Sequence, residues 1–428
     1  MPIRWYSSGA PANDMRSSLD VGNYYPKSVV PSRSTARSNK MTTREGDKGV
    51  NQELDTAASQ QQQASKAQSE SDNKVDIKEL IQKTLEKWIP RSADEERLKS
   101  IMISQRYKFD LEGINKSIFE PIWELLDRGG KRWRSTLVLL VAEALGKKVE
   151  DVIDLCVITE IIHNGSLIID DIEDSSDVRR GKPCLHHMVG LDIAVNVGNM
   201  MYFLPMKVLE EKKKTLSVDT LLQCYEVYSQ EMINVHLGQG LDICWHSRKL
   251  GEDHEPTVEH YLHMCANKTG ALARMSVKLS AIVCGGESLQ VEALGKFAES
   301  LGVAFQIQDD LLNLMEGNSE GSLAAGKGGV GEDIHEGKRT LMVIHSFTHG
   351  TVDDARRLKD ILSMKTYDQV LIREAIDIME RSGSMQYAKE KAQQVLKEAW
   401  AEVDDVLPQT KAKDRLKALA HYMIERSI

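Results

Sequence analysis

Most of this chain consists of segments in which apolar residues recur at helical spacing, separated by short polar breaks. The first segment begins near residue 73 and stops before Pro90, because proline cannot continue a helix. Further helices are predicted over residues 131–145, 149–174, 190–211, 218–244, 256–284, 288–315, 337–348, 354–362, 368–381 and 384–403. We find no strand-like alternation and no repeat of fixed period. The pattern predicts one all-α domain over residues 73–428, with any site built between facing helices.

Residues 1–72 differ from the rest of the chain, because they are rich in Ser, Gln, Asn, Thr and Ala and poor in large aliphatic residues. Such a segment buries too little apolar surface to offset its ordering entropy, so we expect a disordered tail. Its beginning is basic and Ser-rich, as organelle transit peptides are. A tail without a targeting role explains the same composition, and we favour it. We therefore expect a cytoplasmic protein, with organelle import as the alternative.

Charge and cysteine content exclude several classes of protein. The chain has 55 Lys and Arg against 64 Asp and Glu, a net charge of −9, whereas a nucleic-acid groove needs a basic surface. The longest uncharged apolar run, residues 137–142, is too short to span a membrane. The six cysteines include no Cys-x-x-Cys pair, which indicates reduced thiols rather than a disulfide framework or a zinc site. We expect neither a nucleic-acid partner nor a transmembrane segment.

Two carboxylates end the apolar helix predicted over residues 149–174. Asp170 and Asp174 are four residues apart, so a helix places them on one face, one turn from each other. Like charges at that spacing repel unless a cation lies between them, and Mg²⁺ prefers carboxylate oxygens and shares its coordination sphere with phosphates. The pair indicates a magnesium site, while a solvated acidic helix end is the simpler alternative.

A second polar cluster follows another apolar helix. Asp309 and Asn313 are again four residues apart, in the later part of the apolar helix predicted over residues 288–315. Two such helices facing each other would direct their oxygens into a shared cavity. The occurrence of both clusters in one chain is much less expected by chance than either one alone.

Basic residues accompany these clusters. Lys131 and Arg134 are predicted on one helical face after the pair Gly129-Gly130, which lets the backbone approach an anion. Further cations are Arg179, Arg180, Lys268 and Lys338. Arg binds phosphate in a bidentate manner and Lys acts as a point charge. The combination predicts two polyanionic substrates, one bound through metal and one held by Arg and Lys. The Gly-rich stretch 317–331 is predicted to be a mobile loop over the site, with an ordinary surface connection as the alternative.

With these motifs the sequence resembles the trans-prenyltransferase (polyprenyl diphosphate synthase) family, from about Asp127 to Lys338 and more weakly to the C-terminus. The motifs occur in the order and spacing of that family. They are Gly129–Arg134, the aspartate-rich motif Asp170–Pro183, Gly238–Asp242, Lys268–Gly270 and Phe305–Asp310. Within the family the chain is most similar to eukaryotic geranylgeranyl diphosphate synthases, notably over residues 163–175.

The resemblance implies an isoprenoid-synthase-type bundle of antiparallel helices around a deep central cavity, in a homodimer or a higher homo-oligomer. It implies a catalytic set of Asp170, Asp171, Asp174, Lys268, Asp309 and Asp310. It implies that two to three Mg²⁺ ions are held by Asp170, Asp171, Asp174 and Asp309. It implies that the allylic diphosphate is bound by Arg179, Lys268, Thr269, Gln306 and Lys338. It implies that isopentenyl diphosphate is bound by Gly130, Lys131, Arg134, His163 and Arg180.

The sequence departs from the family pattern at three places. Ser135 stands where proline is usual, and Asn313 ends the second aspartate motif, as is common in this branch. The loop lysine of the family most nearly matches Lys327, with one more residue before Asp333 than usual.

The predicted reaction is the head-to-tail elongation of an allylic diphosphate by isopentenyl diphosphate. The allylic C–O bond breaks, the double bond of isopentenyl diphosphate attacks the cation, and a proton is lost to the departing diphosphate. The protein supplies no nucleophile; it positions both substrates and excludes water.

The depth of the cavity is expected to limit the length of the product. Gly165 and Ser166, one turn before Asp170, are small and leave the wall open, which argues against a product of fifteen carbons. The resemblance implies a bulky floor at Tyr202, Phe203 and His236, and hence geranylgeranyl diphosphate; ordinary core positions are the alternative.

Several other functions remain open from the sequence. A farnesyl or longer polyprenyl diphosphate synthase would use the same motifs. A terpene synthase of this fold should lose the isopentenyl site, yet Lys131, Arg134, His163 and Arg180 are present. A non-catalytic partner subunit usually loses an aspartate motif, and neither is lost here. A helical scaffold with acidic helix ends would require all the motif matches to be coincidence.

Overall fold

The structure is a computed structural model that describes residues 77–102, 106–251, 254–315 and 330–425. Almost all of the described residues belong to one compact unit, Ile81–Ile428, which contains the site described below. The predicted tail of residues 1–72 lies outside the described residues, so it stays a prediction. Lys327 and residues 317–329 of the predicted loop also lie outside them.

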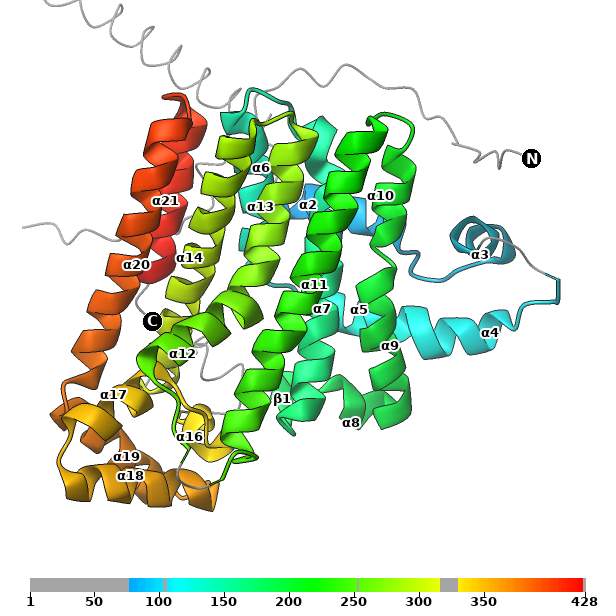
Figure 1. The fold of residues 1–428 in the computed structure, drawn as a ribbon. Coiled ribbons are helices and arrows are strands. Elements are labelled where there is room, and N and C mark those ends of the chain that lie inside the picture. The colour runs from blue at the N-terminus through cyan, green and yellow to red at the C-terminus, as the bar shows by residue number, and fades with distance from the viewer. Residues whose placement is uncertain (1–76, 103–105, 252–253, 316–329, 426–428) are drawn as a thin grey trace, which may run out of the picture. The chain divides into compact units, whose positions relative to one another are not determined.

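Helices make up almost all of the regular structure in the described residues, so the prediction of an all-α fold is confirmed (Figure 1). The first half contains α2 (Ile77–Trp88), α3 (Glu95–Ile101), α4 (Leu111–Ile114), the π-helix η2 (Asn115–Phe119), α5 (Glu120–Leu126), α6 (Trp133–Ala144), α7 (Val149–Glu173), the strands β1 (Val178–Arg179) and β2 (Lys182–Pro183), α8 (Leu185–Val189), α9 (Leu191–Phe203) and α10 (Met206–Lys212). The second half contains α11 (Val218–His246), α12 (Val258–Cys265), the π-helix η3 (Ala266–Gly270), α13 (Ala271–Val283), α14 (Ser288–Asn313), α16 (Glu332–Glu336), α17 (Leu341–His349), α18 (Val352–Met364), α19 (Gln369–Arg381), α20 (Ser384–Val406) and α21 (Lys411–Glu425).

The long helices pack side by side in an up-and-down bundle (Figure 1). Helix α13 packs against α6, α7, α11 and α14, and α14 also packs against α20. Helices α7, α11 and α14 run in one direction, and α6 and α13 run in the opposite one (Figure 1). The acidic C-terminal ends of α7 and α14 therefore lie at the same end of the bundle.

Helix α7 forms part of the core. Its Leu155, Ile158 and Ile162 have no exposed surface, as expected of a helix that is apolar on all sides. By length and composition it is also the one described helix that could cross a membrane, but 67% of its most apolar window is buried in the protein. The expectation of no transmembrane segment rested on uninterrupted apolar runs, a criterion that misses this helix. Neighbouring helices cover the apolar surface of α7.

Local signals explain several helix boundaries and turns. Ser217 begins α11 as its N-cap, where its Oγ accepts a hydrogen bond from the amide of Thr220 at 3.1 Å. Strands β1 and β2 pair antiparallel around Arg180 and Gly181, which both have positive φ angles (54° and 74°). Such angles are those of a two-residue type I′ hairpin turn. The hairpin forms the last part of the aspartate-rich motif Asp170–Pro183.

Some helix boundaries differ from the prediction. Helix α6 begins at Trp133, so Lys131 precedes the helix, and the predicted shared helical face of Lys131 and Arg134 is wrong. The cause is the left-handed backbone of Arg132, with a φ angle of 54°. The predicted helix over residues 190–211 is interrupted at Pro205. The short helices α3, α4, η2 and α5, and the last helix α21, were not predicted.

Candidate active site

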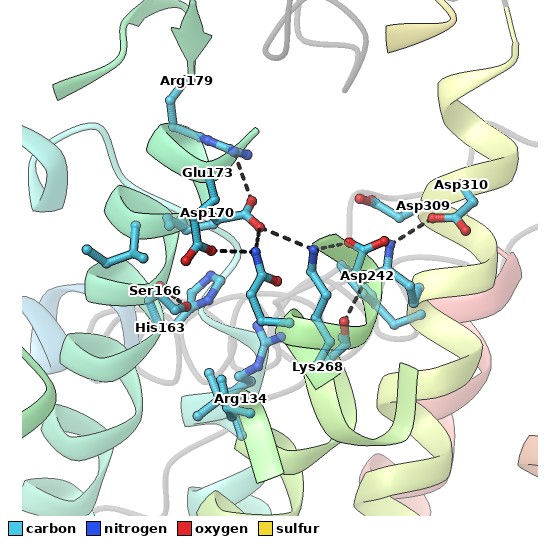
Figure 2. A pocket seen from close by; sticks show the side chains of 18 of the residues that line it. Arg134, His163, Ser166, Asp170, Glu173, Arg179, Asp242, Lys268, Asp309 and Asp310 are labelled. Carbon is cyan, nitrogen blue, oxygen red and sulfur yellow. Dashed lines mark hydrogen bonds and ion pairs between the residues drawn. The ribbon is translucent and has the colours of Figure 1, made fainter. Parts of the chain in front are cut away.

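A cavity of about 460 Å³ opens between α6, α7, α9, α11, η3 and α14. Figure 2 shows Asp170 on one side of this cavity, Asp309 and Asp310 on the other, and Lys268 between them. The predicted site residues that line it are Gly130, Lys131, Arg134, His163, Ser166, Asp170, Arg179, Arg180, Tyr202, His236, Lys268, Thr269, Gln306, Asp309, Asp310 and Lys338. The structure therefore brings the two acidic helices and the basic residues to one cavity, as predicted.

Asp170 belongs to a polar network that crosses the cavity. Its Oδ1 accepts a hydrogen bond from Nε2 of Gln239 at 3.0 Å and lies 3.2 Å from Nζ of Lys268. The same ammonium is 2.5 Å from Oδ2 of Asp242. Burial alone would lower the pKa of Lys268, but the carboxylates of Asp170 and Asp242 outweigh it and raise the pKa above its usual value. Lys268 therefore carries a charge in the position expected for a diphosphate ligand.

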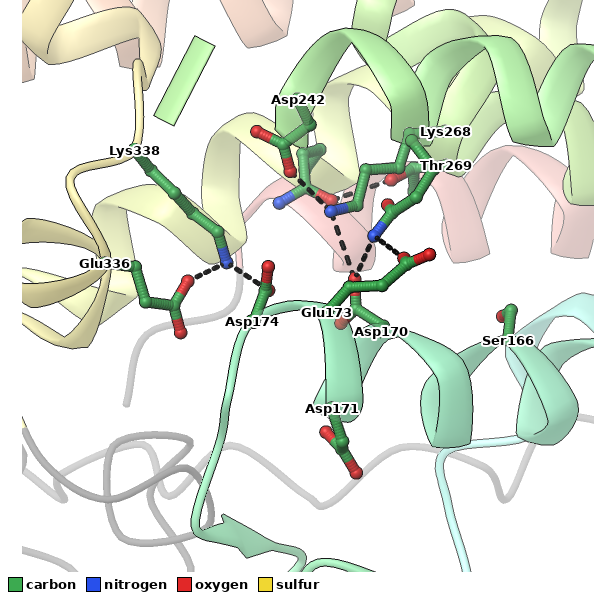
Figure 3. Close-up of polar contacts among 12 residues, drawn as sticks. Ser166, Asp170, Asp171, Glu173, Asp174, Asp242, Lys268, Thr269, Glu336 and Lys338 are labelled. Carbon is green, nitrogen blue, oxygen red and sulfur yellow. Dashed lines mark hydrogen bonds and ion pairs between the residues drawn. The ribbon is translucent and has the colours of Figure 1, made fainter. Parts of the chain in front are cut away.

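Asp171 is not among the residues that line the cavity, although the resemblance implied a metal ligand. Its side chain points away from Asp170 (Figure 3), because consecutive residues of a helix differ in direction by about 100°. Nε of the buried Arg179 donates to Oδ1 of Asp171 at 2.6 Å. The guanidinium of Arg179 also lies 3.5 Å from Oδ2 of Asp170. In this structure Asp171 positions Arg179, which itself lines the cavity.

Asp174 lies in a smaller pocket next to the cavity, which is also lined by Asp170, Asp333, Glu336 and Lys338. Nζ of Lys338 donates to Oδ2 of Asp174 at 3.1 Å and also pairs with Glu336 (Figure 3). The other oxygen of Asp174, Oδ1, is buried without a hydrogen-bond partner. Burial raises the pKa of Glu336 to about 8. The acidic pocket is thus only partly neutralised by Lys338.

The second acidic helix places Asp309 and Asp310 at the cavity but not Asn313. Asp310 accepts hydrogen bonds from the hydroxyl of Tyr261 and from Nε2 of Gln306, both at 2.7 Å. Burial, reinforced by Asp333, raises the pKa of Asp310 to about 7. Oδ1 of the buried Asn313 instead accepts a hydrogen bond from the amide of Asp333 at 3.2 Å. The expectation that Asn313 directs its oxygen into the cavity is therefore wrong; it anchors the start of α16.

The five residues predicted for isopentenyl diphosphate lie together at the cavity. Burial lowers the pKa of both Arg134 and Arg180 to about 10. Burial and the neighbouring arginines hold the pKa of His163 well below its usual value, so its imidazole is neutral. Nε of Arg134 is buried without a hydrogen-bond partner. A cluster of buried cations with an unused donor is suited to an anion that carries several oxygens.

The predicted floor residues divide into two groups. Ser166, Tyr202 and His236 line the cavity, and the rings of Tyr202 and His236 meet edge to face at 5.5 Å. Phe203 does not line it and is 69% exposed. Gly165 is covered by α9, since an added Cβ would lie 2.7 Å from Cβ of Met201. Gly165 therefore lets α7 and α9 pack closely rather than opening the cavity wall.

The cavity residues that had no predicted role include the polar residues Glu173, Gln239, Asp242 and Tyr261. The motif Gly238–Asp242 had been recognised, so Gln239 and Asp242 were detectable. Glu173 lies within the recognised motif Asp170–Pro183 and was detectable in the same way. Tyr261 carries no such signal, because its place depends on how α12 packs. Among the described residues, no group of three His, Cys, Asp or Glu side chains converges closely enough to hold a metal ion. The carboxylates of Asp170 and Asp174 are instead paired with lysines.

The fold and the cavity define a class of protein: an all-helical enzyme for substrates with several negative charges and an apolar part. The comparisons agree. Residues 115–379 match the polyprenyl synthetase family model. The short chain isoprenyl diphosphate synthase of Methanothermobacter thermautotrophicus is 32% identical over 76% of this chain and 96% of its own length. The geranylgeranyl pyrophosphate synthase paxG of Penicillium paxilli is 34% identical over 67% of this chain and 71% of its own length.

The same family is found among solved structures. The crystal structure of geranylgeranyl pyrophosphate synthetase from Pyrococcus horikoshii Ot3 has a TM-score of 0.69 and 30% identity, over 82% of this chain and 97% of that one. The geranylgeranyl pyrophosphate synthase of Corynebacterium glutamicum, solved with isoprenyl diphosphate and magnesium, has a TM-score of 0.68 at 23% identity, over 82% of this chain and 98% of that one, and shares the fold. The chain belongs to the polyprenyl synthetase family, and it is a prenyltransferase.

Proposed function

We propose that this protein condenses isopentenyl diphosphate with an allylic diphosphate and releases geranylgeranyl diphosphate as its main product. The observation that carries the proposal is the single cavity between two acidic helix ends and a buried basic cluster. One side has carboxylates for a metal-bound diphosphate, and the other has Arg, Lys and His for a second one. Relatives named geranylgeranyl pyrophosphate synthase support the product.

The donor set of the cavity fits Mg²⁺. Asp170, Asp174 and Asp309 offer the carboxylate oxygens that this cation prefers, and Oδ1 of Asp174 is buried without a partner. Asp171 would contribute to the site by positioning Arg179, and Asp310 would hold the end of α14 in place. When bound, Mg²⁺ neutralises the allylic diphosphate and makes it a better leaving group. Two to three ions per site remain our prediction.

The chain's own residues bind and orient the substrates. Lys268, Lys338 and Arg179 each pair with a carboxylate in this structure and are positioned to bind the allylic diphosphate. Thr269 and Gln306 hold each other by a hydrogen bond of 2.7 Å beside them. On the other side, Gly130, Lys131, Arg134, His163 and Arg180 are proposed to bind isopentenyl diphosphate.

The reaction then needs alignment and the exclusion of water. The allylic C–O bond breaks, and the double bond of isopentenyl diphosphate attacks the resulting cation. A proton leaves the new C5 unit, and the departing diphosphate accepts it. The apolar walls around Trp133, Leu272 and Phe305 protect the cation from water.

The proposed chain-length limit is set by Tyr202 and His236. Both line the cavity beyond Asp170 and contact each other. Ser166, one turn from Asp170, is small and leaves room for a growing chain between Asp170 and the pair Tyr202 and His236. Phe203 does not contribute to the chain-length limit within one protomer, because it is exposed.

We also propose a homodimer. Exposed large apolar residues recur along one side of α11 and on α9, a pattern typical of an interface between subunits. These residues are Leu191, Phe203, Val218, Leu222, Ile233 and Leu237. Sedimentation of the native chain should give twice the monomer mass, and Leu237→Asp should shift it toward the monomer. A monomeric native chain would contradict this part of the proposal.

Product analysis tests the activity. The purified protein is incubated with labelled isopentenyl diphosphate, farnesyl diphosphate and Mg²⁺, and the dephosphorylated products are separated by chromatography. We expect geranylgeraniol as the main product. A cyclic hydrocarbon made from the allylic substrate alone would indicate a terpene synthase, and a mixture of longer alcohols a polyprenyl synthase.

A further inference from the structure

Glu160 is a buried carboxylate of α7 that borders the cavity beside the basic cluster. A free carboxylate at this position would repel an anionic substrate. Both of its oxygens are occupied, because Nη1 of Arg132 donates to Oε2 at 2.9 Å and Oγ of Ser135 donates to Oε1 at 2.6 Å. Arg132, Ser135 and Glu160 are 9%, 0% and 5% exposed. The three side chains form a buried network beside the turn of residues 129–134, and Nη2 of Arg132 also donates to Oε1 of Gln82 at 3.3 Å.

This network fixes a strained part of the backbone. Arg132 has a left-handed conformation, with a φ angle of 54°, which costs a residue other than glycine about 1–2 kcal/mol. It lies between Lys131 and Arg134, so its conformation decides where these two side chains point. Arg132 is also the N-cap of α6, where its side chain makes no capping hydrogen bond. The ion pair with Glu160 offsets the strain and keeps the turn in one shape.

The next turn of α7 supports the other arginine of the cluster in the same way. Oδ1 of the buried Asn164 accepts a hydrogen bond from Nη1 of Arg180 at 3.1 Å. Nδ2 of Asn164 donates to the carbonyl of Glu160 at 2.8 Å. Arg180 also has a left-handed backbone, with a φ angle of 54°. One face of α7 thus anchors both turns that carry the basic residues.

We propose that Glu160 and Ser135 are positioning residues that hold the turn of residues 129–134 in the shape that binds the diphosphate of isopentenyl diphosphate. The inference rests on the proposed function. Ser135 stands at the position where proline is usual in the family, and proline has no hydroxyl to donate. This chain therefore uses a hydrogen bond to Glu160 at that position.

The test compares Glu160→Gln with Glu231→Gln in the full chain. Glu231 is also a buried carboxylate, 4% exposed, and pairs with Nε and Nη2 of Arg274 at 2.6 Å each. It does not border the cavity. The glutamine at 160 keeps an acceptor for Ser135 but removes the charge that holds Arg132. Initial rates at varied concentrations of each substrate give separate KM values for the two diphosphates.

We expect Glu160→Gln to raise the KM for isopentenyl diphosphate about tenfold, the typical effect of a lost hydrogen bond to a charged group. The KM for the allylic diphosphate should stay within about twofold of the native value. Glu231→Gln should change neither KM. Equal changes of both KM values, or an unchanged KM for isopentenyl diphosphate, would overturn the inference. In that case turnover by the native protein would still support the proposed function. A native protein without turnover would overturn both.

A milder pair of variants keeps the test decisive if Glu160→Gln does not fold. Ser135→Ala removes the donor to Glu160, and Ser280→Ala removes an equally buried hydroxyl that donates to the carbonyl of Val138 at 2.7 Å. Ser135→Ala should raise the KM for isopentenyl diphosphate about threefold. Ser280→Ala should not change it. The same result for both variants would contradict the positioning role.

Discussion

At the scale of single residues, the position of Lys268 depends on how closely two helices approach. A Cβ on Gly238 of α11 would overlap the backbone nitrogen of Lys268 and lie 2.7 Å from the carbonyl carbon of Asn267. Glycine is therefore required at the point where α11 passes η3. Lys268 in turn reaches Asp170 and Asp242 from that backbone. The glycine of this motif has a steric role, and the aspartate has an electrostatic one.

This close approach predicts different effects for alanine at the two glycines of the motif. Gly238→Ala should cost about 1–3 kcal/mol of unfolding free energy through overpacking and should lower kcat by displacing Lys268. Gly240→Ala is the matched control, because its added Cβ would meet no atom of a neighbouring element within 4 Å. It should be at least as stable as the native protein, since alanine is favoured over glycine within a helix, and it should keep the native rates. Denaturant unfolding and steady-state kinetics measure both. Equal behaviour of the two variants would contradict the steric role.

The cavity floor gives a second prediction at this scale. Tyr202→Ala should shift the product distribution to longer chains, because its ring lines the cavity and contacts His236. Phe203→Ala should leave the product unchanged, since that ring is 69% exposed. Chromatography of the dephosphorylated products distinguishes the two. A longer product from Phe203→Ala, without one from Tyr202→Ala, would contradict the assignment of Tyr202 to the cavity floor.

At the scale of secondary structure, the end of α20 is closed by a buried lysine. Nζ of Lys413 donates to the carbonyls of Asp404 and Leu407 at 2.6 and 3.0 Å, and its side chain is 2% exposed. Cations near a helix C-terminus satisfy carbonyls that have no partner within the helix. The lysine thereby fixes the turn between α20 and α21.

Removal of this lysine is expected to destabilise the protein. Lys413→Ala should lower the unfolding free energy by about 2 kcal/mol, because it leaves the buried carbonyl of Leu407 and the part-buried carbonyl of Asp404 without this donor. Lys411→Ala is the control, since Lys411 is exposed two residues earlier on the same helix. Urea unfolding followed by circular dichroism gives both values. If Lys411→Ala lowered the unfolding free energy as much as Lys413→Ala does, the capping role of Lys413 at the end of α20 would be contradicted.

The elements also show what the sequence could predict. The long apolar helices α7, α11 and α14 were predicted within a few residues, because burial keeps their periodicity strict. The π-helix η3 was not, although it carries Lys268 and Thr269. A π-helix differs from an α-helix by one hydrogen-bond register, which apolar spacing does not reveal. The left-handed Arg132 was missed for a related reason, because its conformation depends on Glu160, far away in the sequence.

At the scale of the whole molecule, the motifs identified which residues meet but not how each side chain points. Asp170 and Asp309 were predicted to share a cavity, and they do. Asp171 and Asn313 were predicted with them, yet each faces a partner outside it. Motif spacing determines that residues come together, whereas rotation about each helix axis and the neighbouring chain decide which partner a side chain finds.

The central claim is that carboxylates from two helix ends act together on one diphosphate in this cavity. The most direct test is the rate of labelled isopentenyl diphosphate incorporation by Asp170→Asn and by Asp353→Asn, a control whose side chain is 92% exposed. We predict that Asp170→Asn loses at least about a hundredfold in rate and that Asp353→Asn keeps the native rate. Elongation by Asp170→Asn at the native rate would contradict the account.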